Sequence, residues 1–183
     1  MSPLLRFHDV ALRRGGRLLF EGLNLELGPG DALQVTGPNG SGKSSLIRLA
    51  AGLLRQEWGS LERSSLALAD DFLALDRELP LKRALSFWSH PVDAAMETLG
   101  IAHLSDVPVR LLSSGQEKRA TLARVAASSA PLWLLDEPLN ALDADGAQRL
   151  AKLIGAHLGS GGAVLAASYQ PLPGEWRRLE LRP

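Results

Sequence analysis

Apolar residues alternate with polar ones in the first third of this chain of 183 residues. Two such segments, 4–14 and 18–27, flank Gly15-Gly16, a pair typical of a hairpin turn, so they predict two antiparallel strands. Pro29-Gly30 then fits a type II turn, because proline fixes the first central φ and glycine accepts a positive φ at the second. The run 32–35 that follows predicts a short buried strand.

The rest of the chain alternates between helical and strand-like patterns. Five apolar residues recur at helical spacing and predict one apolar helix face: Leu46, Ile47, Ala50, Leu53 and Leu54. Further helices are expected over 81–88, 92–99, 116–127 and 144–158, and short strands over 66–69, 132–135, 163–167 and 178–181, the last at an edge. This alternation implies a parallel sheet covered on both faces, and the antiparallel strands at the front make that sheet mixed.

Composition narrows the class of protein. Hydrophobic residues make up 45% of the chain, which is enough for a packed core, so a mostly disordered chain is excluded. The 20 basic and 20 acidic residues give a formal charge of zero, which argues against nucleic acid as a partner. Cysteine is absent, so disulfides, thiolate zinc sites and a catalytic thiol are excluded. No uncharged apolar run approaches the roughly 18 residues that a membrane span needs.

The sharpest chemical signal lies between a predicted strand and a predicted helix. It is the motif G-x-x-x-x-G-K-[ST], formed by Gly37, Pro38, Asn39, Gly40, Ser41, Gly42, Lys43 and Ser44. Its glycines let backbone N–H groups turn toward a polyphosphate, and the following helix points its positive end at the same anion. Lys43 would reach the β- and γ-phosphates, and the Ser44 hydroxyl would bind Mg²⁺. Ser45, the next residue, is a further candidate for binding the nucleotide. The alternative is a glycine-rich turn that only caps a helix.

Two acidic residues, Asp136 and Glu137, follow the apolar strand predicted over 132–135. Open α/β folds bind ligands at the carboxyl edge of a parallel sheet, where such a strand ends. Asp136 would hold Mg²⁺ through a water, and Glu137 would orient and deprotonate the attacking water. The alternative is a strand that ends in an ordinary polar loop, but the phosphate-binding motif in the same chain favours the functional interpretation.

A second helix start suited to an anion is predicted at 112–116. Ser113 or Ser114 caps this helix, and Gly115, followed by Gln116, allows a close approach. Taken alone, the segment is typical of an ordinary helix cap.

In their order along the chain, these motifs and the segment Ala141-Leu142-Asp143 resemble the Walker A, signature, Walker B and D-loop elements of the ATP-binding cassette ATPases. The resemblance covers nearly the whole chain. It implies an α/β P-loop fold with a mixed central sheet, antiparallel N-terminal strands and a short helical subdomain. One nucleotide-binding domain would span 1–183, with its core at about 1–75 and 130–183 and the helical subdomain, which includes the signature, at about 76–129.

The segment 168–172, Ser-Tyr-Gln-Pro-Leu, and the short length resemble the ATPase subunit of the bacterial cytochrome c biogenesis transporter, a haem exporter. That resemblance implies an ATPase that acts through membrane subunits on separate chains, which work on haem delivery or on its release from a haem chaperone. The ATPase would lie peripherally at the cytoplasmic face of the inner membrane. It would form a head-to-tail homodimer around two ATP molecules, in which Ser113, Gly115 and Gln116 touch the γ-phosphate bound by the other subunit.

Three positions depart from the family pattern. Tyr169 stands where the family has a switch histidine; tyrosine donates a hydrogen bond but stays neutral, and losing one positioned donor costs about 10²–10³ in rate. The Q-loop glutamine is replaced near Phe72; Asp71 would take over the water-mediated metal contact and Phe72 would pack where a membrane subunit docks, or both only cap a loop. Arg14 falls where an aromatic ring stacks on adenine, and its guanidinium plane would stack with weaker selection of ATP over GTP.

Two functions follow from these observations. The chain is a slow transporter ATPase, or it is a cassette that binds nucleotide with little hydrolysis and stabilises an assembly. The intact residues Lys43, Ser44, Asp136 and Glu137 favour the ATPase. An ATPase of a different transporter is a further alternative. A cassette of DNA repair or translation fits poorly, because such proteins usually carry coiled-coil arms or two cassettes, which 183 residues do not accommodate.

Overall fold

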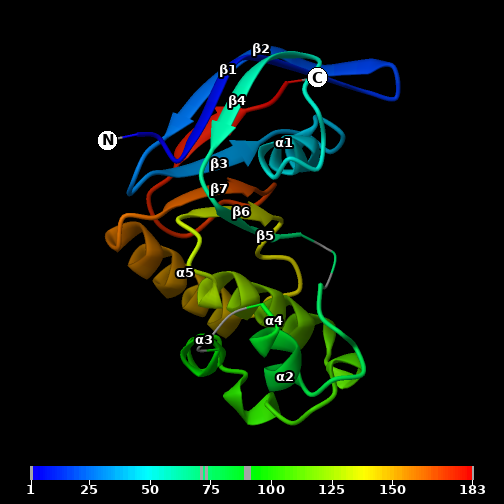
Figure 1. The fold of residues 1–183 in the computed structure, drawn as a ribbon, viewed down its shortest axis with the longest axis vertical. Helices are drawn as coiled ribbons and strands as arrows, with labels where there is room; N and C mark the ends of the chain where they lie inside the picture. The colour runs from blue at the N-terminus through cyan, green and yellow to red at the C-terminus, as the bar shows by residue number, and fades with distance from the viewer. Residues whose placement is uncertain (1, 71, 73, 89–91, 183) are drawn as a thin grey trace.

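The computed structural model describes residues 2–70, 72, 74–88 and 92–182, and in this part of the chain the strands lie in two sheets (Figure 1). The antiparallel sheet has the order β2-β1-β4 and consists of β1 (Leu5–Arg14), β2 (Arg17–Leu27) and β4 (Trp58–Arg63). The parallel sheet has the order β5-β6-β7-β3-β8 and consists of β3 (Ala32–Thr36), β5 (Leu66–Ala69), β6 (Leu132–Asp136), β7 (Ala163–Ala167) and β8 (Arg177–Glu180).

The α/β fold class and the predicted strands are confirmed, and the antiparallel and parallel strands belong to separate sheets instead of one mixed sheet. The separation has a simple cause, because both hydrogen-bonding edges of β1 are occupied by β2 and β4. In the same way, β3 has β7 on one edge and β8 on the other. The sequence pattern did not predict β4, which has mostly exposed residues on both faces and therefore no alternation of polar and apolar positions.

Helices cover the parallel sheet on both faces (Figure 1). α1 (Lys43–Ala50) packs on β6 and β7 from the side of the antiparallel sheet, whereas α4 (Ser114–Ala127) and α5 (Ala144–Gly159) pack on β5 and β7 from the other side. The short helices α2 (Leu81–Ser86) and α3 (Asp93–Thr98) contact α4, and the 3₁₀ turns η1 (Ala102–Leu104) and η2 (Val109–Leu111) connect them to it. Among the described residues, no helix has the length and apolar character needed to cross a bilayer.

Two hydrophobic cores lie on the two faces of the parallel sheet. One fills the space between the antiparallel sheet, α1 and the sheet, and includes Phe7, Leu46 and Ile47, which are at most 2% exposed. The other lies under α4 and α5 and extends to α2 and α3. The phosphate-binding motif and the signature segment therefore begin helices on opposite faces of the same sheet.

The first helix is shorter than predicted. α1 ends at Ala50, and the N–H groups of Gly52 and Leu53 return to the carbonyls of Leu49 and Arg48 at 2.9 and 2.8 Å, a helix-ending motif that places Gly52 at φ +77°. Leu53 follows this turn and is 61% exposed, so its predicted place on the apolar helix face was wrong. Leu54 still packs against the first core.

Candidate functional site

The predicted phosphate-binding loop connects the end of β3 to the start of α1. Gly37 opens the loop at φ +140°, and a Cβ at this position would lie 2.4 Å from the carbonyl oxygen of Leu181. No side chain fits there without displacing backbone, so glycine is required. The loop then reaches Gly42, the N-cap residue of α1, and directs the amino end of the helix into the same space.

Lys43, the first residue of α1, lies beneath this loop. Its side chain is buried, and its ammonium group donates hydrogen bonds to the carbonyl oxygens of Gly37 and Pro38 at 2.8 and 3.1 Å. Ser41 is also buried, and its hydroxyl has no hydrogen-bond partner within the described part of the chain. A closely turned loop, a buried cation and an unsatisfied hydroxyl fit the cradle of a polyphosphate.

Ser44 and Asp136 meet at the carboxyl end of the parallel sheet. The Ser44 hydroxyl donates to Oδ1 of Asp136 at 3.0 Å, although 92 residues separate them, and Asp136 is only 3% exposed. A hydroxyl and a carboxylate are hard oxygen ligands of the kind that Mg²⁺ prefers. The third predicted metal ligand, Asp71, lies outside the described residues.

Glu137 follows Asp136 and turns away from the strand. Its backbone adopts φ +44°, and its N–H donates to the carbonyl of Ala167 at the end of β7. Its carboxylate accepts a hydrogen bond from the backbone N–H of Tyr169 at 3.4 Å. The switch position and the predicted general base are therefore neighbours. Tyr169 is 60% exposed, and its phenol oxygen accepts a hydrogen bond from the side chain of Gln170.

One depression of about 370 Å³ brings most of the predicted nucleotide-binding residues together. Its lining consists of Arg14, Leu19, Asn39, Gly40, Gly42, Lys43, Ser44, Ser45 and Glu137. The guanidinium of Arg14 donates to the Ser45 hydroxyl at 3.3 Å, which anchors the hairpin of β1 and β2 at the mouth of this depression. Arg14, the predicted adenine-stacking residue, thus lies beside the loop that would hold the phosphates.

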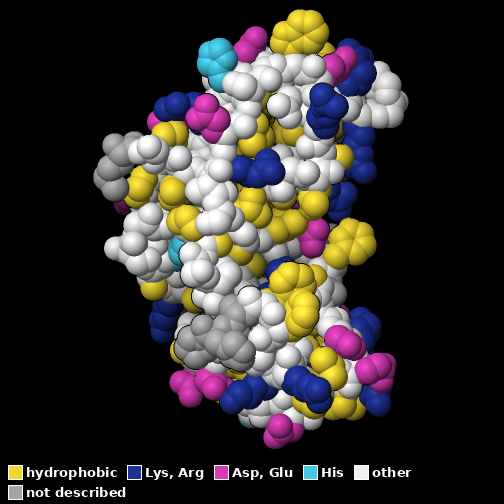
Figure 2. Space-filling view, in the orientation of Figure 1, with side chains coloured by type: hydrophobic (Ala, Val, Ile, Leu, Met, Phe, Trp, Pro, Cys, Tyr) yellow, Lys and Arg dark blue, Asp and Glu magenta, His cyan; other side chains and the backbone are white. Residues whose placement is uncertain are grey.

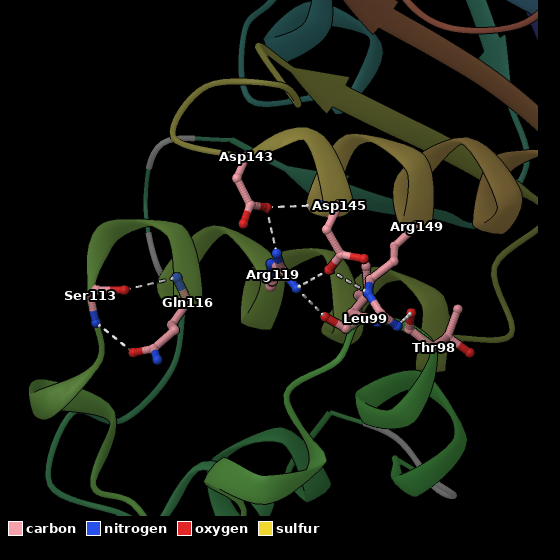
Figure 3. Close-up of polar contacts among 9 residues, drawn as sticks. Thr98, Leu99, Ser113, Gln116, Arg119, Asp143, Asp145 and Arg149 are labelled. Carbon is pink, nitrogen blue, oxygen red and sulfur yellow. Dashed lines mark hydrogen bonds and ion pairs between the residues drawn. The ribbon is translucent and has the colours of Figure 1, made fainter.

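The signature residues line a second depression, of about 460 Å³, that shares no residue with the first. Ser113 caps α4, as predicted, through a reciprocal capping box with Gln116 in which each side chain accepts a hydrogen bond from the other's backbone N–H (Figure 3). A Cβ on Gly115 would lie 2.9 Å from the carbonyl oxygen of Ala141, so the start of α4 packs directly on the segment before α5. The phosphate loop and the signature segment thus line separate depressions of the chain.

Arg119 anchors the signature helix to its surroundings, a role that the sequence reasoning missed. Its guanidinium is mostly buried and bonds the carbonyl of Leu99 and the carboxylates of Asp143 and Asp145 (Figure 3). Asp143 caps α5, and the N–H of Gly146 and the guanidinium of Arg119 hold its pKa below the usual range. The signal was available, because Arg119 lies one helical turn after Gly115 in a segment already singled out.

Lys118 is a second residue that was missed. It is only 8% exposed, and its ammonium donates to the backbone carbonyl of Asp136 at 3.3 Å. This contact joins the signature helix to the strand end that carries both predicted carboxylates. Helical spacing could have indicated it, because Lys118 falls on the same stripe of α4 as the buried residues Leu122 and Val125.

The segment after β5 is described only in part. Phe72 is 70% exposed, and the guanidinium of Arg48 lies 5.9 Å from its ring centroid. Arg124 of α4 donates to the carbonyl of Leu68 in β5 at 2.6 Å, and burial lowers the pKa of its guanidinium. This contact fixes the end of β5, from which the predicted Q-loop starts.

Comparison with known proteins decides the family. The sequence pattern of the ABC transporter family matches residues 20–140, which contain the phosphate loop, the signature segment and both carboxylates. The chain belongs to the ABC transporter family. Within that family it is 54% identical over 177 residues to the cytochrome c biogenesis ATP-binding export protein CcmA of Sphingopyxis alaskensis, covering 92% of this chain and 91% of that protein. It is 55% identical over 168 residues to the CcmA protein of Novosphingobium aromaticivorans, covering 90% of this chain and 87% of that protein.

Solved structures agree on the fold of this ABC transporter subunit. An ATP-binding protein of an ABC transporter from Pyrococcus furiosus superposes with a TM-score of 0.85, covering 97% of this chain and 96% of that chain. Sequence identity in that pair is 20%, so the likeness concerns the fold alone. The predicted family and its cytochrome c biogenesis branch are thus confirmed by the sequence relatives, and the fold by the structure.

Proposed function

We propose that this chain binds Mg·ATP and hydrolyses it as the ATP-binding subunit of a bacterial transporter complex for c-type cytochrome biogenesis. The observation that carries the proposal is the 3.0 Å contact between Ser44 and Asp136 beside the buried ammonium of Lys43. This contact joins the phosphate loop to the acidic strand end. Bound Mg²⁺ would neutralise charge on the β- and γ-phosphates.

Each residue has a distinct task in this proposal. Lys43 and the loop N–H groups hold the phosphates, and Ser44 and Asp136 hold the metal, with Asp71 as a further metal-binding residue. Glu137 accepts the proton of the attacking water, and its contact with the Tyr169 N–H sets the direction of the carboxylate. Tyr169 takes the place of the family's switch histidine, and Arg14 stacks on the base.

The active unit in this proposal is a head-to-tail homodimer. Two half-sites with no residue in common lie in one chain, one built on the phosphate loop and one on the signature. A second copy would place Ser113, Gly115 and Gln116 over the γ-phosphate held by the first. The amino end of α4 would supply partial positive charge there, and the capping box already engages the N–H groups of Ser113 and Gln116.

The conformational change that accompanies ATP hydrolysis would be transmitted to membrane subunits on separate chains. Apolar side chains are exposed on one face of the molecule (Figure 2). Phe87 is 82% exposed and, with Trp88, lines a depression of about 460 Å³ beside α2. Phe72 is a further exposed aromatic residue, in the predicted Q-loop. A surface of this kind suits a segment of a membrane subunit, and this contact would hold the chain peripherally at the cytoplasmic face of the inner membrane.

The molecule on which the whole transporter complex acts would be haem, which is either exported or released from a haem chaperone.

A second candidate function is a cassette that binds nucleotide with little hydrolysis. The observation that favours it is Tyr169, a neutral residue in the place of the switch histidine, whose phenol is engaged by Gln170. In that case the chain would stabilise its membrane assembly through nucleotide-dependent dimerisation. The geometry around Glu137 favours hydrolysis, because a binding-only cassette has no need of a carboxylate directed at the phosphate pocket.

Hydrolysis of Mg·ATP by the purified chain with its membrane subunits separates the candidates. Lys43→Ala should abolish ATP binding measured by calorimetry. Glu137→Gln should retain binding but lose turnover by about 10²–10³. Equal rates for wild type, Glu137→Gln and Tyr169→His would reject the ATPase in favour of the binding cassette. Co-purification with membrane subunits of an unrelated transporter would instead assign the ATPase to a different complex.

A further inference from the structure

Gln34 is a polar residue in the buried strand β3, three positions before Gly37, where the phosphate loop begins. It is 1% exposed. Its neighbours Leu33 and Val35 belong to the core on the α1 side of the sheet, so strand alternation directs the Gln34 side chain to the opposite face. Its pairing partner on β7, Ala166, belongs to the core on that face. A buried amide among apolar neighbours requires hydrogen-bond partners.

Within the described part of the chain, the partners of the Gln34 amide lie in the loop 168–172 that follows β7. Its Nε2 donates to the carbonyl of Gln170 at 2.7 Å and to that of Ser168 at 3.5 Å. Its Oε1 accepts from the backbone N–H of Leu172 at 3.5 Å. One side chain on the strand that enters the phosphate loop therefore holds both sides of Tyr169.

This loop in turn contacts the predicted general base, because the Tyr169 N–H reaches the carboxylate of Glu137 at 3.4 Å. In this geometry the loop and the Gln34 amide satisfy each other's hydrogen-bonding groups. An apolar side chain in place of Gln34 would leave the Gln170 carbonyl and the Leu172 N–H without these partners. Since unpaired buried polar groups are costly, the loop would move to reach water.

We propose that Gln34 is a positioning residue for hydrolysis: it fixes the loop 168–172 so that the Tyr169 N–H stays on the Glu137 carboxylate. The inference rests on the proposed ATPase function and adds a residue that lies outside the phosphate loop, the signature and the acidic strand end. Gln34 connects β3, which leads into the phosphate loop, to the loop 168–172, which contacts the predicted general base Glu137. Gln34 itself touches neither nucleotide nor water in this role.

The first test uses the fact that Tyr169 is the sole tyrosine of the chain. Full-length protein labelled with fluorotyrosine gives a single fluorine NMR resonance that reports on this loop. Gln34→Met, which keeps the side-chain volume, should shift or broaden the resonance toward that of the unfolded chain. The matched control is Thr121→Val, which removes a hydroxyl that is also buried but bonds the Glu117 carbonyl within α4. It should leave the resonance unchanged.

The second test separates positioning from stability by kinetics. In the complex with membrane subunits, Gln34→Met should lower kcat by about 10- to 100-fold, because small displacements near reacting groups have effects of that size. The KM for ATP should stay within about twofold, because the phosphate loop keeps its own contacts. Gln34→Asn retains an amide on a side chain that is one methylene too short, so it should also shift the Tyr169 resonance and lower kcat. If Gln34→Met does not fold, Gln34→Asn replaces it in both tests.

The outcomes distinguish this inference from the proposed function. An unchanged fluorine resonance in both Gln34 variants would overturn the positioning role and leave Gln34 as a structural core residue. A fall in kcat that is matched in Thr121→Val would do the same. If the wild type does not hydrolyse ATP at all, the ATPase proposal fails, while the resonance still decides whether Gln34 controls the loop.

Discussion

The imidazole of His157 stacks on the indole of Trp133, with ring centroids 3.7 Å apart and ring planes 9° from parallel. The histidine comes from α5 and the tryptophan from β6. The Nε2 atom of His157 lies 3.2 Å from the carbonyl of Pro131, and Gly162 passes so close that a Cβ there would lie 2.2 Å from the same nitrogen. Burial lowers the pKa of His157 below its ordinary value, despite opposing hydrogen bonds to the backbone.

This stacked pair predicts an acid-sensitive fold. The unfolded chain binds a proton at His157 near its ordinary pKa of about 6.5, whereas the folded chain does so only at lower pH. The stability contributed by the neutral ring is therefore complete above about pH 6.5 and is lost as the pH falls through the folded-state pKa. His157→Phe keeps the stack but cannot titrate. Urea unfolding at about pH 7.5 and about pH 5 should show a smaller loss for this variant than for wild type, and equal losses would contradict the assignment.

Two glycines of the phosphate loop should respond differently to alanine. Gly37→Ala places a methyl group 2.4 Å from the Leu181 carbonyl at a φ of +140°, so it should destabilise the fold by more than about 3 kcal/mol and prevent ATP binding. Gly40 also has a positive φ, but nothing lies within 4 Å of an added Cβ. Gly40→Ala should therefore lower the free energy of unfolding by only about 1 kcal/mol. Urea denaturation and calorimetric titration with Mg·ATP check both values. Similar losses at the two positions would show that backbone strain, and not the close approach to the Leu181 carbonyl, causes the destabilisation.

Arg119 should stabilise the contact between the signature helix and α5. Arg119→Met retains the buried stem but leaves the Leu99 carbonyl without its guanidinium donor, which should cost about 1–3 kcal/mol in the free energy of unfolding. ATP-driven dimerisation should weaken as well, because the cap of α5 and the start of α4 would no longer be fixed to each other. The matched control is Arg182→Met, which removes an exposed pair with Glu180 and should change stability by less than about 1 kcal/mol. Gel filtration with Mg·ATP and urea unfolding measure the two effects.

Local motifs in the sequence indicated the candidate nucleotide site, but they did not indicate the tertiary contacts that support it. The phosphate loop could be identified because its chemistry resides in consecutive residues, and Ser113 could be assigned as a cap for the same reason. Gln34 was missed because its partners are backbone groups up to 138 residues away, which no spacing rule indicates. Helical spacing could have indicated that Lys118 is buried, but not that its partner is the Asp136 carbonyl 18 residues away. The contacts of Gln34 form only when β3 and β7 pair in parallel.

The errors in the predicted elements have equally specific causes. β4 escaped prediction because a strand with two exposed faces carries no hydrophobic alternation, and it forms only because β1 offers it a free edge. Leu53 continued a helical spacing that Gly52 interrupts, so a local conformational signal outweighed a periodic one. The separation into two sheets depends on which strand edges are already paired, and that information is not local to any segment.

The exposed aromatic pair beside α2 supplies the last prediction. The rings of Phe87 and Trp88 meet edge to face, with centroids 5.4 Å apart. Trp88 is also fixed by a hydrogen bond to the Ala74 carbonyl and by the guanidinium of Arg124. Phe87, in contrast, is 82% exposed. Phe87→Ala should therefore change the free energy of unfolding by less than about 0.5 kcal/mol. If this surface receives a membrane subunit, the same variant should weaken the complex by at least about tenfold, as truncation of a central aromatic residue does in other interfaces. Affinity measured in detergent tests this expectation against Trp58→Ala, an equally apolar change at a 69% exposed residue of β4. A complex that tolerates Phe87→Ala as well as Trp58→Ala would place the membrane subunits on another face.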